Sequence, residues 1–318
     1  MNKANRQFMN TISAENDTWK AATKPKIAAL IPTFNRAKSL TICLQCLREQ
    51  NFTDIRATLL PIVIVDGSTD GTLELLKREF PEAVVILGNG DWWYTKCINE
   101  GIKTAIRLTC DFVLTLNDDL SFATDYVSNI LRDYYSVSPG SIIGCVSLSR
   151  DLPRIITFSG VSKISYTLKE FNYIPKFSPV SEEILSGIKE SVLLSGRGIL
   201  FPIGVFEQLG LYDEKLVQYS AETDFTYTAH KKGIPVMISY NAIVYENVNL
   251  TSAGAVYNNP SLKKVYKSFQ NNYSINSFRK IWYYSIKHRG RISGCFIALL
   301  RTAGVLKNYI QIKLKTKG

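Results

Sequence analysis

Short apolar runs that alternate with amphipathic stretches restrict the fold of this chain more than any other feature. The apolar runs have the length of buried strands and occupy residues 26–32, 59–65, 83–87 and 111–116. The stretches between them, residues 35–50, 73–80 and 98–108, repeat apolar residues at helical spacing. Strands that are buried on both faces and alternate with helices indicate a mainly parallel sheet with helices on both sides. We therefore predict an α/β fold.

The pattern is less regular after residue 117. Residues 140–190 mix short β-like runs with polar stretches, which indicates an inserted hairpin or a region on the acceptor side. Residues 192–202 (VLLSGRGILFP) predict a strand around a glycine turn, and helices are expected over 205–209 and 221–232. Two late strands are expected over 236–238 and 243–245, so the predicted sheet is mixed and mainly parallel.

Composition excludes several classes of protein. The chain has 318 residues, of which 46% are hydrophobic and 20% charged, as in a packed globular protein rather than a disordered one. Six cysteines include one CxxC pair, Cys43 and Cys46, without a second pair to complete a zinc site, so we expect reduced thiols. Two histidines argue against a histidine-rich metal cluster or a Ser/His hydrolase. The chain has no GxGxxG or GxxxxGK[ST] motif, which disfavours a dinucleotide or P-loop site.

The polar loops that leave the four predicted strands indicate a ligand site. They are residues 32–36 (PTFNR), 66–71 (DGSTDG), 88–93 (GNGDWW) and 117–119 (NDD). Taken singly, each is explained equally well as a turn, a helix cap or a core tryptophan pair. Ligands of open parallel sheets bind at the carboxyl ends of the strands, however, and these loops share that edge. The carboxylates of residues 118–119 are suited to a divalent ion that bridges diphosphate oxygens.

Six motifs in order resemble those of family 2 glycosyltransferases, which have the GT-A nucleotide-sugar fold. They are LIPTFNR, VIVDGSTDGT, NEGI, LTLNDD, SGRGILFP and AETDF. GNGDWW is similar to the branch that includes bacterial rhamnosyltransferases. The resemblance implies a GT-A domain over residues 25–250, between a polar leader of residues 1–24 and a basic helical extension of residues 251–318.

The resemblance also implies roles for individual residues. Pro32, Thr33 and Arg36 would line the nucleotide pocket, and Asp66 would accept hydrogen bonds from the base or ribose. Trp92 and Trp93 can stack on a sugar or base or pack in the core, and Arg197 can approach the diphosphate from a glycine turn. With neighbouring residues, the predicted substrate-binding set is Pro32, Thr33, Phe34, Arg36, Asp66, Gly67, Ser68, Gly90, Trp92, Trp93, Asn99, Asn117, Asp118, Arg197 and Gly198.

The family pattern assigns the metal and the base to acidic residues. It places the ligand of Mg²⁺ or Mn²⁺ at Asp119, and Glu246 occupies the place where many relatives have a metal-binding histidine; Glu246 can equally be a surface residue. Glu222 matches the catalytic base and Asp224 the second acid. A glutamate at 222, where aspartate is commoner, reaches one methylene further. Both acids also fit a helix start, where they complement the helix dipole.

These assignments predict a metal-dependent, inverting glycosyltransferase. The donor would be a nucleotide-diphosphate sugar of the UDP or dTDP type. The acceptor would be a hydroxyl of a glycan or a lipid-linked molecule in bacterial cell-surface polysaccharide synthesis.

The positive charge is concentrated at the C-terminal end. Residues 247–318 contain 13 Lys and Arg and no Asp or Glu, which leaves 25 basic against 27 acidic residues over 1–246. An apolar stripe follows helical spacing within this extension: Ile292, Cys295, Phe296, Leu299, Leu300 and Ala303. This pattern favours an interfacial helix on an anionic membrane; the alternative is a helical hairpin packed on the body or on a partner chain. The N-terminal residues lack the apolar run of a secretory signal, so we expect a cytoplasmic protein on the inner face of the membrane.

Two other functions fit part of the sequence. A nucleic-acid-binding protein could use the basic, aromatic extension for phosphate contacts. Acidic residues at the expected ligand edge argue against that function, and no nucleic-acid partner is expected. A nucleotidyltransferase would share the nucleotide site but release pyrophosphate.

Overall fold

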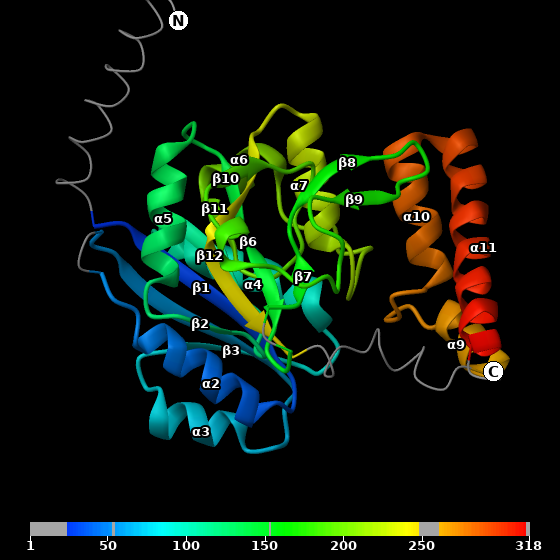
Figure 1. Ribbon diagram of the computed structural model, residues 1–318. Coiled ribbons are helices and arrows are strands. Elements are labelled where there is room, and N and C mark those ends of the chain that lie inside the picture. Colours follow the sequence, from blue (N-terminus) through cyan, green and yellow to red (C-terminus); the bar gives the residue numbers. More distant parts are fainter. Residues whose placement is uncertain (1–23, 53–54, 153, 248–260, 316–318) are drawn as a thin grey trace, which may run out of the picture.

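A ten-stranded mixed sheet forms the centre of the molecule (Figure 1). The computed structural model describes residues 24–52, 55–152, 154–247 and 261–315. The strands are β1 (Lys26–Thr33), β2 (Thr58–Asp66), β3 (Val84–Gly88), β4 (Phe112–Thr115), β5 (Ser121–Phe122), β6 (Ile142–Ser149), β7 (Ile156–Phe158), β8 (Val161–Ile164), β9 (Glu170–Asn172), β10 (Ile188–Glu190), β11 (Ile199–Pro202) and β12 (Val236–Glu246). The helices are α2 (Ala37–Arg48), α3 (Thr72–Glu79), α4 (Trp93–Arg107), α5 (Tyr126–Ser136), the 3₁₀ turn η1 (Glu182–Ile184), α6 (Gly204–Leu209), α7 (Ala221–Lys231), α9 (Leu262–Gln270), α10 (Phe278–Arg289) and α11 (Arg291–Lys315).

The sheet is mainly parallel, as predicted. Its order is β10-β12-β6-β11-β4-β1-β2-β3, with β5 paired to β12 and β7 to β6. The pairs β1–β2, β1–β4, β2–β3 and β6–β12 are parallel, whereas β11 lies antiparallel between β4 and β6. The carboxyl ends of β1, β2, β3, β4, β6 and β12 therefore share one edge with the start of β11. That edge carries every polar strand-end motif found in the sequence.

The alternation of side chains along β1 explains the two-sided core. Ile27, Ala29 and Ile31 belong to a buried cluster with α2, α3 and α5, whereas Ala28 and Leu30 belong to a second cluster with α4, α6 and α7. Successive strand residues point to opposite faces of a sheet, so a strand covered on both faces needs an unbroken apolar run. All six cysteines are free thiols, as expected.

Several expected boundaries were wrong. Residues 192–198 form a loop, and the strand begins only at Ile199, because Gly198 has φ +73° and donates its N–H to the carbonyl of Thr115 at 2.9 Å. The two late strands form one strand, β12, with a register shift between Ser239 and Ile243. Within the region expected to be an insertion, β6 is a central strand of the main sheet and β8–β9 form the hairpin. The sequence reasoning missed α5 altogether.

The C-terminal helices form a hairpin against the body. α10 and α11 lie side by side at one end of the molecule (Figure 1). Lys287 and His288 of α10 bond to Asp224 of α7, and Ile297 of α11 is fully buried. This arrangement corresponds to the alternative of a hairpin packed on the body, although α11 keeps an exposed apolar face. Among the described residues, no helix combines the length and apolar character needed to cross a bilayer. Residues 1–23 of the predicted leader and 251–260 of the predicted extension lie outside the described residues.

Candidate active site

The first strand end brings four predicted residues together around two buried carboxylates. Thr33 donates its hydroxyl hydrogen to Asp118 Oδ2 at 2.8 Å, and Arg36 Nη1 donates to Asp118 Oδ1 at 3.1 Å. The same Arg36 nitrogen lies 3.6 Å from Asp119 Oδ2. Burial raises the pKa of Asp118 to about 6, although the charge of Arg36 and the bond from Thr33 oppose this rise. The loops after β1 and β4 thus form one anionic centre whose charge Arg36 partly offsets.

Asp119 and Glu246 lie on neighbouring backbone segments. Ser121 of β5 pairs with Tyr245 of β12, so the loop that carries Asp119 runs beside the end of β12. Arg150 joins the two segments, because its Nη2 donates to the Asp119 carbonyl at 2.7 Å and its backbone N–H donates to the Glu246 carbonyl at 2.8 Å. The buried Glu246 carboxylate forms an ion pair with Arg197 Nε at 2.7 Å. Glu246 is therefore not a surface residue.

This donor set fits a divalent ion held together with a diphosphate. Mg²⁺ in nucleotide sites is commonly bound by one or two carboxylates plus phosphate oxygens and water. The described residues contain no cluster of three or more His, Cys, Asp or Glu that could hold an ion without the substrate. Asp119 would supply one such carboxylate. Glu246 would supply a second only by exchanging its bond with Arg197.

Asp66 organises the turn after β3. Its Oδ1 accepts the N–H of Gly90 at 2.8 Å, and its Oδ2 accepts the N–H groups of Trp92 at 3.0 Å and Trp93 at 2.9 Å. These bonds hold the start of α4 against the end of β2. Asp66 is 6% exposed, and its contact with a base or ribose stays a prediction.

The loops after β1 and β2 are tied by side chains that sequence reasoning overlooked. Asn35 donates its N–H to Ser68 Oγ at 3.0 Å and accepts the Thr69 N–H at 2.7 Å. Asp70 accepts the N–H of Ala37 at 3.0 Å, the first residue of α2. The signal was present in the sequence, because a DGSTDG run contains two potential caps. The loops after β1 and β2 are therefore cross-linked by hydrogen bonds.

Gly67 is the point of closest backbone approach in these loops. Its φ is +73°, and a Cβ there would lie 2.6 Å from the Cα of Gly90. We expect Gly67→Ala to lower the free energy of unfolding by more than about 2 kcal/mol, because left-handed strain of about 1 kcal/mol or more adds to a backbone clash. Gly71→Ala is the matched control, since its φ is +83° but no atom lies within 4 Å of its Cβ position. Urea denaturation of both variants compares their free energies of unfolding. Equal losses of stability would contradict a backbone clash at Gly67.

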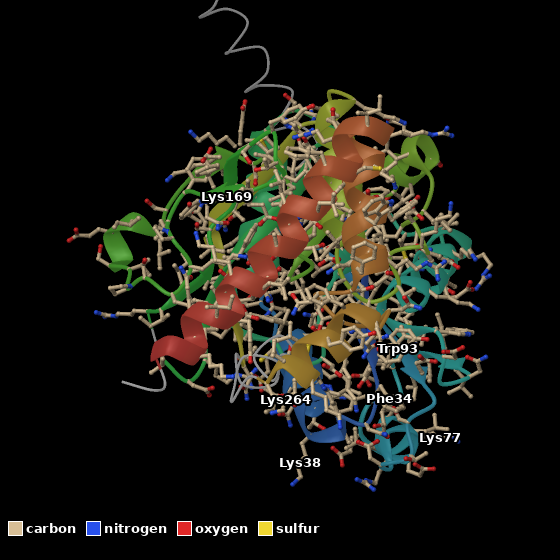
Figure 2. All side chains as sticks on the ribbon, turned by 90° about the vertical axis from the view of Figure 1, so that its right-hand side faces the viewer. Phe34, Lys38, Lys77, Trp93, Lys169 and Lys264 are labelled. Atoms are coloured by element: carbon tan, nitrogen blue, oxygen red, sulfur yellow. The ribbon has the colours of Figure 1, made fainter. Side chains whose placement is uncertain are left out.

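The two tryptophans have different surroundings. The ring of Trp93 stacks on Tyr273, with centroids 3.7 Å apart and planes at 9°. Trp92 packs partly buried against the core, with Lys96 Nζ 5.1 Å from its ring centroid. One face of Trp93 is thus covered by the segment between α9 and α10. Figure 2 shows Trp93 and Phe34 at the end of the molecule where Lys264 of α9 lies.

Other predicted substrate contacts have internal partners. Asn99 is 1% exposed, donates to the Tyr212 carbonyl at 2.9 Å and accepts the Tyr212 N–H at 3.0 Å. It therefore holds the loop that precedes α7. The carbonyl of Asn117 accepts the N–H of Leu120. Phe34 has no such enclosed position, because its side chain is 55% exposed. Pro32 is half-buried at the end of β1.

Glu222 lies in the first turn of α7, beside the glycine turn that precedes β11. Its carboxylate accepts the N–H of Gly196, and burial raises its pKa above the ordinary value against the lowering effect of its own backbone N–H and of Arg197. Its Oε2 and the hydroxyl of Tyr94 are both shielded from solvent and without a hydrogen-bond partner among the described residues. A Cβ on Gly196 would lie 2.7 Å from the Tyr94 hydroxyl and 3.1 Å from Glu222 Cδ. Both unpaired groups therefore lie beside this glycine.

Asp224, two residues later, is engaged on both oxygens. His288 Nε2 lies 2.9 Å from Oδ1, and Lys287 Nζ donates to Oδ2 at 2.8 Å. The residue is 3% exposed. Glu222 thus has a free acceptor atom, and Asp224 connects α7 to the C-terminal hairpin.

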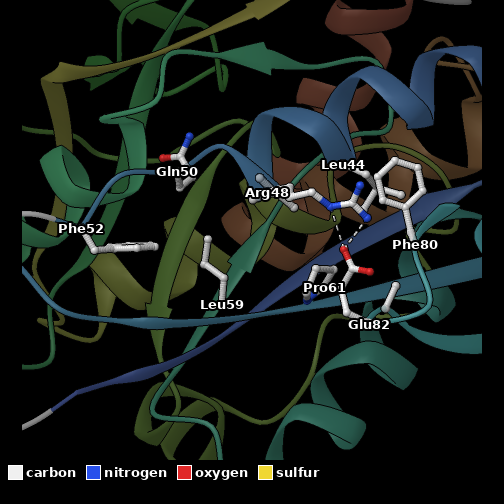
Figure 3. Close-up of a pocket in the computed structure, with 10 residues that line it drawn as sticks. Leu44, Arg48, Gln50, Phe52, Leu59, Pro61, Phe80 and Glu82 are labelled. Carbon is white, nitrogen blue, oxygen red and sulfur yellow. Dashed lines mark hydrogen bonds and ion pairs between the residues drawn. The ribbon is translucent and has the colours of Figure 1, made fainter.

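A surface pocket among the described residues lies away from this site. A pocket of about 210 Å³ lies between α2, β2 and the end of α3, with the Arg48–Glu82 ion pair at its rim (Figure 3). It shares no residue with the predicted site. Its lining offers no acid or base for transfer chemistry beyond that ion pair.

The comparisons with known proteins agree with the fold and the strand-end motifs. Residues 28–175 match the model "Glycosyl transferase family 2". A curated relative from Methanococcus voltae, a dolichyl N-acetyl-α-D-glucosaminyl phosphate 3-β-D-2,3-diacetamido-2,3-dideoxy-β-D-glucuronosyltransferase, is 27% identical over 254 residues, covering 76% of this chain and 70% of its own. Its name does not support the expected likeness to rhamnosyltransferases.

Two solved structures share the fold. A mannosyltransferase from Pyrobaculum calidifontis, in complex with GDP-Man and Mn²⁺, matches 96% of this chain and 89% of its own at 16% identity and a TM-score of 0.50. GalNAc-T7 with UDP, GalNAc and Mn²⁺ matches at 12% identity and a TM-score of 0.54; the alignment covers 85% of this chain but only 52% of that protein. Residues 28–175 of this chain are therefore similar to glycosyltransferase family 2, and the chain has a GT-A-like fold.

Proposed function

We propose that this protein is a metal-dependent, inverting glycosyltransferase that moves a sugar from a nucleotide-diphosphate donor to a hydroxyl of a lipid-linked or glycan acceptor. The observation that carries the proposal is the arrangement at one sheet edge. The Arg36–Asp118–Asp119 centre lies at the carboxyl ends of β1 and β4, and Glu222, with a buried oxygen that has no partner among the described residues, is close enough to Arg197 for its charge to act on it. The family match and the Mn²⁺ complexes of the related folds support it.

The chain's own residues account for binding and proton transfer. Asp119, with Glu246, would hold Mg²⁺ or Mn²⁺, which neutralises charge on the departing nucleoside diphosphate. Arg197, which is paired with Glu246 in this structure, would bind the diphosphate once that ion pair opens. Glu222 takes the proton from the acceptor hydroxyl as that oxygen attacks the anomeric carbon from the face opposite the leaving group. A single displacement of this kind inverts the anomeric configuration.

The nature of the acceptor follows from the curated relative. That relative is named for transfer to a dolichyl N-acetylglucosaminyl phosphate, so we propose a lipid-linked acceptor for this chain too.

The identity of the donor is tested by incubating the purified protein with UDP-, dTDP- and GDP-sugars, with and without Mn²⁺. We expect release of a nucleoside diphosphate that requires the ion. Release of pyrophosphate would instead identify a nucleotidyltransferase, and no release from any donor would remove the proposal.

We further propose that α11 places the enzyme on the inner face of an anionic membrane. Its exposed apolar residues repeat at intervals of three and four: Ile292, Phe296, Leu299, Ala303, Leu306 and Ile310. Ile292 is 91% exposed, and Lys307 and Lys313 flank the stripe on either side. Figure 2 shows α11 lying across the outer surface of the molecule. An apolar stripe with basic margins and no acidic residue fits anionic lipid better than a second copy of the same basic helix.

Vesicle binding tests this placement. We expect Phe296→Ser with Leu299→Ser to weaken binding to vesicles containing anionic lipid at least about tenfold, because two half-exposed apolar side chains lose their burial. The control pair is Ile42→Ser with Leu87→Ser, which are 41% and 59% exposed on other elements. Co-flotation measures binding. Unchanged flotation of the α11 variant, or retention of nucleic acid with a steep salt dependence, would contradict a membrane role.

A further inference from the structure

Two basic side chains of the C-terminal hairpin, Lys280 and Arg301, act on each other electrostatically, and Lys280 also interacts with Glu222. Lys280 is in the first turn of α10, where its ammonium bonds to the Ile275 carbonyl and lies 5.4 Å from the ring centroid of Tyr219. Tyr219 comes three residues before Glu222. Arg301 of α11 lies with Cζ 5.5 Å from the ring centroid of Tyr284, and its Nη1 is shielded from solvent without a hydrogen-bond partner. Among the described residues neither cation forms an ion pair, although the charge of Glu222 acts on Lys280 and that of Glu170 on Arg301.

The electrostatics of this pair are unfavourable as they stand. Burial, together with the smaller effect of the charge of Arg301, lowers the pKa of Lys280 to about 7, although Glu222 opposes the change. Burial also lowers the pKa of Arg301. Two like charges that approach each other in a low-dielectric region repel strongly and lose hydration. A ligand anion would satisfy both.

The position of Lys280 and Arg301 indicates which substrate would carry that anion. Glu222 is the proposed base, so the acceptor hydroxyl must reach it. Lys280 is close enough to Glu222 for its charge to affect the carboxylate. The donor diphosphate is accounted for at Arg36, Asp119 and Arg197, on the sheet edge. The cations of the hairpin are therefore left for the acceptor.

We propose that Lys280 and Arg301 bind a phosphate carried by the acceptor, so that the acceptor is a glycosyl phosphate whose sugar hydroxyl reaches Glu222. This inference rests on the proposed function and names its acceptor class. Phosphate oxygens accept charge-assisted hydrogen bonds from both ammonium and guanidinium groups. The unpaired Nη1 of Arg301 is a donor available for one of them. Recognition of the phosphate would orient the sugar ring toward the base and reject neutral glycans.

Binding of small probes to the full chain, without donor, tests the site. N-acetylglucosamine 1-phosphate, N-acetylglucosamine and inorganic phosphate are titrated by calorimetry. We expect the sugar phosphate to bind at least tenfold more tightly than the sugar. In Lys280→Met and, separately, Arg301→Met, this preference should fall to within about twofold. Lys267→Met, which changes an exposed lysine of α9, should keep the preference.

Three outcomes would overturn the proposal. They are equal binding of sugar and sugar phosphate by the unaltered protein, a preference that persists in both variants, and binding of inorganic phosphate as tight as that of the sugar phosphate. The last would identify a site for free phosphate. Donor cleavage is measured on the same preparations, so loss of the transferase proposal and loss of the phosphate site give different results. Lys280→Arg keeps the charge and should retain most of the preference.

Discussion

Glu222→Gln is expected to lower the turnover number by about 10²- to 10⁴-fold while donor binding persists, because the amide cannot take the proton from the acceptor hydroxyl. The stability of this variant should equal or exceed that of the unaltered protein. The change removes a buried charge whose Oε2 has no partner. Turnover is measured with a donor and acceptor found active in the panel, and stability by urea denaturation.

The matched control is Glu207→Gln, an exposed acid on α6, which should leave turnover unchanged.

The pH profile of kcat/KM for the unaltered protein provides an independent check. Burial raises the pKa of Glu222 above its ordinary value of 4.5, and the base is inactive when protonated. The acid limb of kcat/KM should therefore lie above pH 4.5, with activity lost as the pH falls through the raised pKa. Near-normal turnover of Glu222→Gln would remove this residue from the role of base.

Asp224→Asn should produce the largest loss of stability, about 3 kcal/mol. Removing one partner of a buried ion pair leaves the other charge uncompensated, and Asp224 is bonded to both Lys287 and His288. Because this link holds α10 against α7, turnover should fall together with stability. Urea denaturation and turnover are measured on the same preparation.

Asp213→Asn is the control for Asp224. Asp213 also accepts from Lys287, at 2.6 Å, but its side chain is 22% exposed, so its loss should cost about 1 kcal/mol or less. If Asp224→Asn instead abolished turnover at unchanged stability, Asp224 would act in catalysis rather than as an anchor. Together with Glu222→Gln, this comparison separates the chemistry of α7 from its support.

The first half of the fold could be predicted because its signals are local. The apolar runs of β1, β2 and β4 bury both faces, and the helices α2 and α3 repeat their apolar residues at helical spacing. The glycine turn before β11 was misjudged for the opposite reason. An antiparallel strand between two parallel ones is set by the bond from Gly198 to Thr115, which no local pattern records. The helix α5 was missed because its buried face, which includes Tyr126, Ser128 and Asp133, is partly polar.

The sequence alone determined that polar residues follow the apolar strands at one edge of a mainly parallel sheet, because strand direction and side-chain alternation are properties of the local chain. Tertiary structure decided what each of those residues does. Glu246 forms an ion pair with Arg197, and Asp66 accepts hydrogen bonds from three backbone N–H groups. Asp224 bonds to two residues of α10 that are 63 and 64 positions away in the sequence. A buried carboxylate bonds to whichever donors packing places beside it. Those donors belong to segments that are distant in the sequence, so local sequence patterns do not identify them.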